Sequence, residues 1–168
     1  YGVPVSGAMD NYALRIANLL VGNNEGEAGL EITLLGLQLR LLEDTVVAIT
    51  GADLSPMLNK NPLPMWEAVV VGCGALISFH WPKKGCRSYL AVAGGIDIPK
   101  VMGSSSTYVK SHIGGVEGRP LRAGDCLKSG KARPGILGRK LPPQYVPEYR
   151  NQSELRVILG PQDDHFTE

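Results

Sequence analysis

The apolar residues near the start of the chain follow a helical period. Four of them share the spacing that brings side chains to one face of an α-helix: Met9, Ala13, Ile16 and Leu20. Three polar residues fall outside this stripe: Asn11, Arg15 and Asn18. Ser6 and Asp10 are candidate N-caps, and Gly22 offers an exit that tolerates a left-handed backbone. The pattern predicts one amphipathic helix at about 10–21, with the apolar stripe in the core.

Beyond Gly29 the pattern changes to short runs of β-branched and large apolar residues. These runs predict strands at 30–35, 37–42, 45–50, 68–71, 75–80 and 87–93. The first three are expected to pair as consecutive antiparallel strands, since only short turns separate them. Three prolines and an Asn-Lys-Asn turn predict a loop or a tight hairpin after Asp53. Many short strands with one helix predict a mainly β fold, either a closed barrel or a sandwich.

The C-terminal part differs in composition from the rest. Residues 1–130 are expected to form the β domain, with one more short strand at 125–128. Residues 131–152 hold four prolines and no apolar periodicity, which predicts an extended connector. Residues 153–168 contain a last apolar run, 155–160, which predicts a strand that leads into a further part of the polypeptide.

Charge and cysteine content exclude several classes of protein. Lysine and arginine number 17 and aspartate and glutamate 16, a net charge of +1, so we expect neither nucleic acid nor an anionic membrane as partner. No apolar run reaches the roughly 18 residues of a membrane span, which favours a cytoplasmic protein. The three cysteines are widely spaced and are expected to be reduced thiols rather than metal ligands or a disulfide framework.

Common catalytic and nucleotide-binding motifs are missing from the sequence. It contains no phosphate-loop motif, no dinucleotide fingerprint and no serine-nucleophile elbow. The three histidines are far apart and have no metal-ligand spacing, so no metal site is expected. His112 and His165 lie in polar segments and are the better candidates for groups that titrate.

Polar side chains at the ends of the predicted strands form the candidate site. They are Asp53, Ser106, Thr107, Arg119, Gln162 and Asp163. In a small barrel such strand ends can converge on one rim around a polar ligand, although Asp53 and Asp163 could equally cap their own turns. The turn at Ser6 and Gly7 could direct backbone N–H groups at an anion, or could simply begin a capped helix.

Six blocks of the chain resemble the allophanate hydrolase subunit 2 family, also called the carboxyltransferase subdomain A and B family. The blocks are GVPVSGAMDNYALRIANLLVGN (2–23), LEITLLG (30–36), AITGADLSPMLN (48–59), YLAVAGGIDIPKVMGSSSTY (89–108), GGVEGRPLRAGD (114–125) and LRVILGPQDDHFTE (155–168). The resemblance implies a cyclophilin-like β-barrel, a second half after the last block, and an active site shared with a cyclophilin-like partner subunit. This partner would be of the subunit 1 or KipI type.

The resemblance leaves three functions open. The first is part of an ATP-dependent 5-oxoprolinase, corresponding to its C subunit, that opens a small lactam to glutamate, with ATP bound through the assembled complex. The second is the carboxyltransferase part of a urea carboxylase or allophanate hydrolase system, which uses carboxybiotin carried by a partner. The third is a regulatory binding protein of the KipA type that performs no chemistry.

The resemblance and the pattern of polar residues together assign roles to residues. Arg119, Ser106, Thr107 and Asp53 are expected to be catalytic. Residues expected to bind substrate are Ser6, Gly7, Asp10, His112, Gln162 and Asp163. The family pattern has an arginine in the middle of the block GSxSTY, where this chain has Ser105; this departure removes a fixed positive charge.

Overall fold

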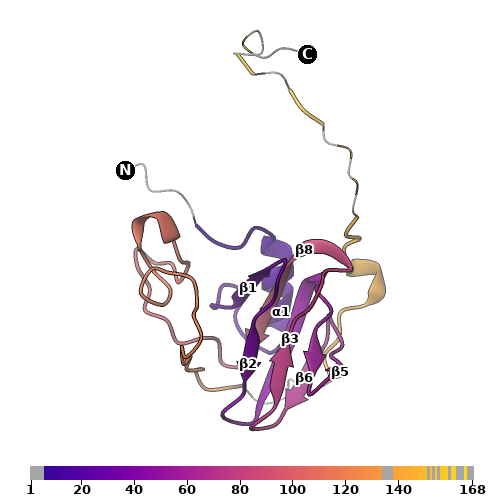
Figure 1. The fold of residues 1–168 in the computed structure, drawn as a ribbon, viewed down its shortest axis with the longest axis vertical. Helices are drawn as coiled ribbons and strands as arrows, with labels where there is room; N and C mark the ends of the chain where they lie inside the picture. Colours follow the sequence, from indigo (N-terminus) through magenta and orange to yellow (C-terminus); the bar gives the residue numbers. More distant parts are fainter. Residues whose placement is uncertain are drawn as a thin grey trace.

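The computed structural model describes residues 6–133, 138–150, 152, 154, 156–158, 160–161 and 165. These residues form a mainly β fold with one α-helix, as predicted (Figure 1). The elements are α1 (Asn11–Leu20), β1 (Leu30–Thr33), β2 (Gln38–Arg40), β3 (Thr45–Asp53), β4 (Met57–Leu58), β5 (Asn61–Pro62), β6 (Ala68–Val71), β7 (Leu76–Ser78), β8 (Lys84–Val92) and the 3-10 turns η1 (Val109–Ser111) and η2 (Pro143–Tyr145). The six predicted strands between residues 30 and 93 are therefore confirmed, with small differences at their ends. The hairpin alternative after Asp53 is confirmed as β4 and β5.

The strands pair into two antiparallel sheets of four. Their orders are β1-β8-β3-β6 and β2-β7-β4-β5. Among the described residues the pairing does not close a barrel, which differs from the closed form of the prediction. The expectation that the first three strands pair consecutively is wrong, because β1 pairs with β8 and β2 with β7, in different sheets. Proximity in sequence does not decide these pairings; burial of the apolar faces does.

The core has two layers because β3 and β8 are covered on both faces. Val47 and Ile49 of β3 face the second sheet, where they share one cluster with Ile77 of β7 and with Phe79, which follows β7. The intervening Ala48 and, on β8, Ala91 face the helix, where they meet Ala17 and Leu20. The period of two along a strand separates these two sets. Small side chains on the outer face let α1 approach the sheet closely.

The helix is confirmed, and its buried face is the predicted one in part, since Ala13 and Leu20 are buried and Ile16 packs against the core. Asp10 is the N-cap, and its Oδ1 accepts a hydrogen bond from the Ala13 N–H at 2.9 Å. Met9 precedes the helix and is 71% exposed, so its predicted place in the core is wrong. Asn18, predicted to lie on the polar face, is fully buried. Its side chain donates to the carbonyl of Glu27 at 2.8 Å, which anchors the loop after the helix.

The described part of the predicted connector packs along the domain. The Leu141 N–H donates to the Trp66 carbonyl at 2.9 Å, and the Ala68 N–H donates to the Arg139 carbonyl at 2.8 Å. Tyr149 stacks on Trp66 with a centroid distance of 6.5 Å. Its hydroxyl donates to Asp10 Oδ2 at 2.7 Å. This segment therefore fastens the chain onto the start of α1.

Two further predictions concern strands near the C-terminus. The prediction of a short strand at 125–128 is wrong, because these residues are in no strand. The next residue, Ser129, makes one isolated bridge with Ile96. Of the predicted strand at 155–160, residues 156–158 and 160 are in no strand and the other positions lie outside the described residues. The expected continuation into a second half stays a prediction.

Replacing Tyr149 with phenylalanine is expected to lower the free energy of unfolding by about 1.5 kcal/mol, the usual contribution of a hydrogen bond to a charged group. The stacking on Trp66 is kept in this variant, so the loss reports the hydroxyl alone. Tyr12→Phe is the matched control, because its hydroxyl donates to the Tyr145 carbonyl at an exposed position. Urea unfolding should show less than about 0.5 kcal/mol for the control. Equal losses in both variants would contradict the role of Tyr149.

The same variant changes the response to alkaline pH. Burial first, and then the hydrogen bond to Asp10, raise the pKa of Tyr149 well above its ordinary value of 10.0. A raised pKa in the folded state stabilises the protein below the unfolded pKa, and this contribution is lost as pH rises above about 10. The melting temperature of the wild type should therefore fall more steeply above pH 10 than that of Tyr149→Phe.

The described residues hold neither a membrane-spanning helix nor a cluster of metal ligands. Among them, no helix is both long and apolar enough to cross a membrane. No group of three or more histidine, cysteine, aspartate or glutamate side chains in the same residues is arranged to hold a metal ion. The three cysteines are free thiols at exposed positions.

Candidate functional site

A groove of about 1080 Å³ lies between the start of α1, the strand β1 and the long loop after β8. Its walls include Ser6 and Gly7 from the N-terminal turn, β1 from the sheet, and fifteen residues of the loop between Ile96 and Leu127. Figure 1 shows this loop as the salmon and orange excursion beside β1. It has no regular strand, and turns with positive φ shape it. The groove is therefore built by residues far apart in the sequence.

Hydroxyl groups gather where the N-terminal turn meets the loop. Ser106 Oγ lies 3.8 Å from the position that a Cβ would take at Gly7. Ser104 Oγ donates to Ser106 Oγ at 2.9 Å and accepts from the Ser106 N–H at 3.1 Å. Thr107 lies against Gly115, where any Cβ would meet its Oγ1. The structure thus brings the predicted residues Ser6, Gly7, Ser106 and Thr107 into one wall.

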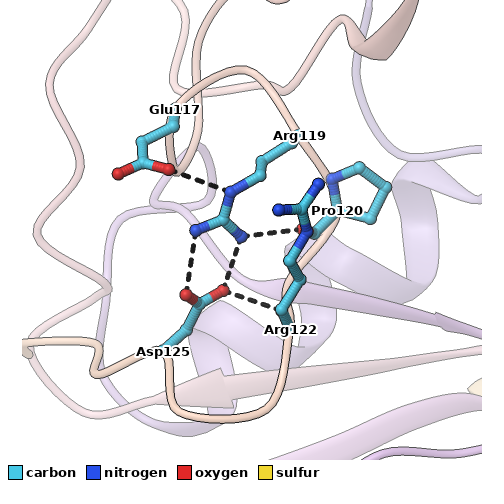
Figure 2. Close-up of polar contacts among 5 residues, drawn as sticks. All are labelled: Glu117, Arg119, Pro120, Arg122 and Asp125. Carbon is cyan, nitrogen blue, oxygen red and sulfur yellow. Dashed lines mark hydrogen bonds and ion pairs between the residues drawn. The ribbon is translucent and has the colours of Figure 1, made fainter.

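Arg119 lines the same groove, but its guanidinium is held by its own loop (Figure 2). Nη1 and Nη2 donate to the two oxygens of Asp125 at 2.8 and 3.0 Å, and Nε donates to Glu117 at 2.9 Å. Nη1 also donates to the Pro120 carbonyl at 3.1 Å. Four of the five N–H donors of an arginine are occupied in this way, so the group mainly shapes the loop. Its predicted direct role at substrate stays a prediction.

The charge of Arg119 is matched closely by Asp125. Hydrogen bonds from Arg119 and from the Arg122 N–H lower the pKa of Asp125 to about 2. The hydrogen bond to Asp125 likewise raises the pKa of Arg119. Both side chains are largely covered, with exposed fractions of 16% and 18%. A bidentate pair of this kind fixes orientation as well as charge.

The inner end of the groove is a tyrosine and carboxylate network that sequence reasoning missed. The buried hydroxyl of Tyr89 donates to Glu31 Oε2 at 2.9 Å and accepts from the Asp10 N–H at 2.8 Å. The same oxygen of Glu31 accepts from the Met9 N–H at 2.9 Å. Burial raises the pKa of Tyr89 above its ordinary value, so the phenol stays protonated. The alternation of apolar and polar residues along β1 and β8 does not predict this network, because the network depends on the pairing of Glu31 with Tyr89 across the two strands.

Two predicted site residues, Asp53 and His112, lie elsewhere, and two more cannot be placed relative to the groove. Asp53 ends β3 away from the groove, where Oδ1 accepts from the Ser55 N–H at 2.8 Å and Oδ2 lies 3.5 Å from Lys83 Nζ. The alternative that it caps its own turn fits this geometry. His112 ends η1 with a left-handed φ of 54° and is not in the groove wall. Gln162 and Asp163 lie outside the described residues.

Asp10 lies next to the groove but does not line it. Its carboxylate is occupied by the Ala13 N–H and the Tyr149 hydroxyl, so it caps the helix rather than facing the groove. It contacts the groove only through its N–H bond to Tyr89. We therefore regard Asp10 as a residue that positions the N-terminal turn.

The groove can bind a small polar molecule and polarise a carbonyl group on it. Serine and threonine hydroxyls and backbone N–H groups are donors that stabilise negative charge developing on an oxygen. The imidazoles of His80 and His112 are not among the lining residues. The wall therefore offers donors and charges, and no arrangement of a nucleophile with a histidine base.

The whole chain matches a family of known proteins. A family described as "Carboxyltransferase domain, subdomain A and B" matches residues 1–168. The chain is 41% identical over 165 residues to the C subunit of the 5-oxoprolinase of Escherichia coli strain K12, a match that covers 98% of this chain and 52% of that protein. It is 37% identical over 166 residues to the urea amidolyase of Saccharomyces cerevisiae, covering 95% of this chain and 9% of that protein.

The fold is similar to that of a solved urea carboxylase. The crystal structure of the Kluyveromyces lactis urea carboxylase superposes with a TM-score of 0.74 at 40% sequence identity, covering 90% of this chain and 13% of that one. The chain therefore spans about half the length of the bacterial relative and a much smaller part of the fungal ones.

Proposed function

This chain belongs to the family of carboxyltransferase domains, subdomain A and B, and on that premise we propose that it works in an ATP-dependent 5-oxoprolinase. The family confirms the resemblance drawn from the six sequence blocks. In this proposal the chain is part of a subunit that binds 5-oxoproline while its lactam is opened to glutamate. A cytoplasmic location, where ATP is present, suits this function.

The groove is the observation that carries the proposal. It is lined by hydroxyls at 104–107 and by the turn at Ser6 and Gly7, and it is large enough for a five-membered lactam with a carboxylate. Opening the lactam puts negative charge on the amide oxygen, and preorganised donors lower the energy of that charge. Ser106 and Thr107 are the donors we assign to the oxygen.

Sequence identity supports this choice. The chain is 41% identical over 165 residues to the C subunit of the 5-oxoprolinase of Escherichia coli and 37% identical over 166 residues to the urea amidolyase of Saccharomyces cerevisiae. We therefore rank the 5-oxoprolinase function ahead of carboxyl transfer.

We assign ATP to a partner subunit rather than to this chain. The glycine pair after β8, Gly94 and Gly95, has both of its N–H groups occupied. The Gly94 N–H donates to Asn23 Oδ1 at 2.8 Å and the Gly95 N–H donates to the Val92 carbonyl at 2.9 Å. Neither N–H is free to hold a phosphate. We propose a cyclophilin-like subunit as this partner, placed over the open side of the groove.

Carboxyl transfer from biotin is the second candidate, and the similarity to the urea carboxylase of Kluyveromyces lactis favours it. In that case a partner carries carboxybiotin, the same donors hold the carboxyl group, and an amide nitrogen accepts it. The Ser104 to Thr107 wall serves either reaction, because both build negative charge on oxygen.

Reconstitution tests the proposal. The full polypeptide that contains this chain is combined with its partner subunits, and ATP-dependent release of glutamate from 5-oxoproline is measured. We expect turnover that requires both the partner and ATP. ATP use that depends on urea and biotin would move the assignment to carboxyl transfer. Stable assembly with no turnover on any of these substrates would favour a regulatory protein of the KipA type.

A further inference from the structure

Lys100 differs from the other cations of the groove because it has no partner among the residues that the structure describes. Three cationic side chains line the wall: Arg15, Lys100 and Arg119. Arg15 pairs with Glu25 and Arg119 with Asp125. Across the part of the chain that the structure describes, Lys100 makes no hydrogen bond or ion pair. Its ammonium is available to a ligand.

The backbone sets Lys100 opposite the serine loop. Val101 and Ser104 exchange N–H to carbonyl hydrogen bonds of 2.8 and 3.0 Å, one in each direction. This antiparallel bridge places Lys100 across from Ser105, and side chains opposite one another leave the same face of the backbone. Both residues line the groove, beside the hydroxyls of Ser104 and Ser106. A positive charge and several hydroxyl donors therefore share one end of the groove.

The carboxylates of the groove are engaged by other residues. Glu25 is paired with Arg15. Glu31 accepts hydrogen bonds from Tyr89 and Met9 and faces Arg87 at 3.3 Å. Among the described residues, the carboxylate of Glu27 accepts a hydrogen bond only from the neutral amide of Asn24, at 3.1 Å, and pairs with no cation. Its uncompensated negative charge lies on the same groove wall as Lys100.

We propose that Lys100, together with the hydroxyls of Ser104 to Ser106, binds the carboxylate of an acidic lactam substrate. This assignment rests on the proposed 5-oxoprolinase function and adds the group that selects for a carboxylate. An ammonium ion and hydroxyl donors together match the charge and the acceptor oxygens of such a group. A neutral lactam lacks this contact and should bind without help from Lys100.

Binding of two probes tests the assignment. The full polypeptide, assembled with its partner, is titrated calorimetrically with 5-oxoproline and with 2-pyrrolidinone, which has the same ring without the carboxylate. Lys100→Gln should weaken 5-oxoproline binding about tenfold, the loss of one charge-assisted contact, and should leave 2-pyrrolidinone unchanged. Lys110→Gln is the matched control, because Lys110 is exposed on the same loop and outside the groove wall. It should change neither affinity.

Restoring the charge from across the bridge provides a second measurement. Ser105→Arg in the Lys100→Gln background should recover most of the lost affinity for 5-oxoproline. Glu27→Gln should strengthen it, because a competing negative charge is removed. Melting temperatures check that each variant is folded.

Defined results would overturn the assignment. These are wild-type affinity for 5-oxoproline in Lys100→Gln, an equal loss for both probes, or no binding of 5-oxoproline by the wild type. If the reconstituted complex binds 5-oxoproline through Lys100 but never turns it over, the carboxylate site stands and the proposed 5-oxoprolinase function falls.

Discussion

Arg119→Ala is expected to lower turnover of the assembled enzyme about a hundredfold, the scale of loss when a reacting group is displaced by about 1 Å. The melting temperature should fall by only a few degrees, because the side chain lies in a loop outside both sheets and its contacts are to residues of that loop. The guanidinium joins Glu117, Pro120 and Asp125 across one turn (Figure 2). Without it, the groove wall that carries Arg119 loses its cross-links.

Substitution of Asp125 separates positioning from direct contact with substrate. If Arg119 acts by holding the loop, Asp125→Asn should reproduce most of the activity loss, because the bidentate pair is broken while the arginine remains. Glu117→Gln is the control; the side chain of Glu117 is 74% exposed, and its pair with Arg119 is expected to contribute little. Full activity in Asp125→Asn, together with a large loss in Arg119→Ala, would instead place the guanidinium on the substrate. Parallel losses of activity and melting temperature in Arg119→Ala would contradict both roles.

Asn18→Asp is expected to lower the free energy of unfolding by about 3 kcal/mol, although the two side chains have nearly the same shape. The amide of Asn18 donates to the Glu27 carbonyl at 2.8 Å and to the Glu25 carbonyl at 3.3 Å, in a fully buried position. Aspartate would set a carboxylate oxygen against those carbonyl oxygens, and a buried charge without a partner costs several kcal/mol unless it is protonated.

The measurement is urea unfolding of the full chain. Asn61→Asp is the matched control, because Asn61 is exposed on β5 and its substitution should change stability by less than about 0.5 kcal/mol. Asn18→Asp should also recover part of its loss at low pH, where protonation restores a donor. An effect of Asn18→Asp as small as that of the control would show that the loop after α1 does not depend on the buried amide.

Asn18 also shows where sequence reasoning failed. Periodicity placed it on the polar face, since an asparagine beside an apolar stripe usually faces water. The chain after α1 turns back over that face, and the carbonyls of Glu25 and Glu27 need a donor there. Asn23 extends the same arrangement, because its side chain donates to Asn18 Oδ1 and to the Val92 carbonyl. Only the path of the loop turns a polar residue into a buried one.

The candidate site was predictable in part. The rule that polar residues at strand ends converge on one rim identified Ser106, Thr107 and Arg119, which line the groove. The same rule selected Asp53, which lies elsewhere, because a strand end gives no information about which end of the sheet it shares. Glu31 and Tyr89 were missed, since each looks like an ordinary strand residue until β1 pairs with β8.

Local patterns were sufficient for the positions of α1 and of the six predicted strands, and they limited the N-cap to Ser6 or Asp10; shared blocks of sequence carried the resemblance to the family. These properties depend on residues within a few positions of one another, or on blocks of sequence that relatives share. The folded structure decided which strands pair, that Asn18 is buried, and that Asp125 holds Arg119. The first two depend on segments that meet only after folding, where apolar faces and buried polar groups find their partners. The third joins residues only six positions apart, but the conformation of the loop between them decides whether the two charges meet.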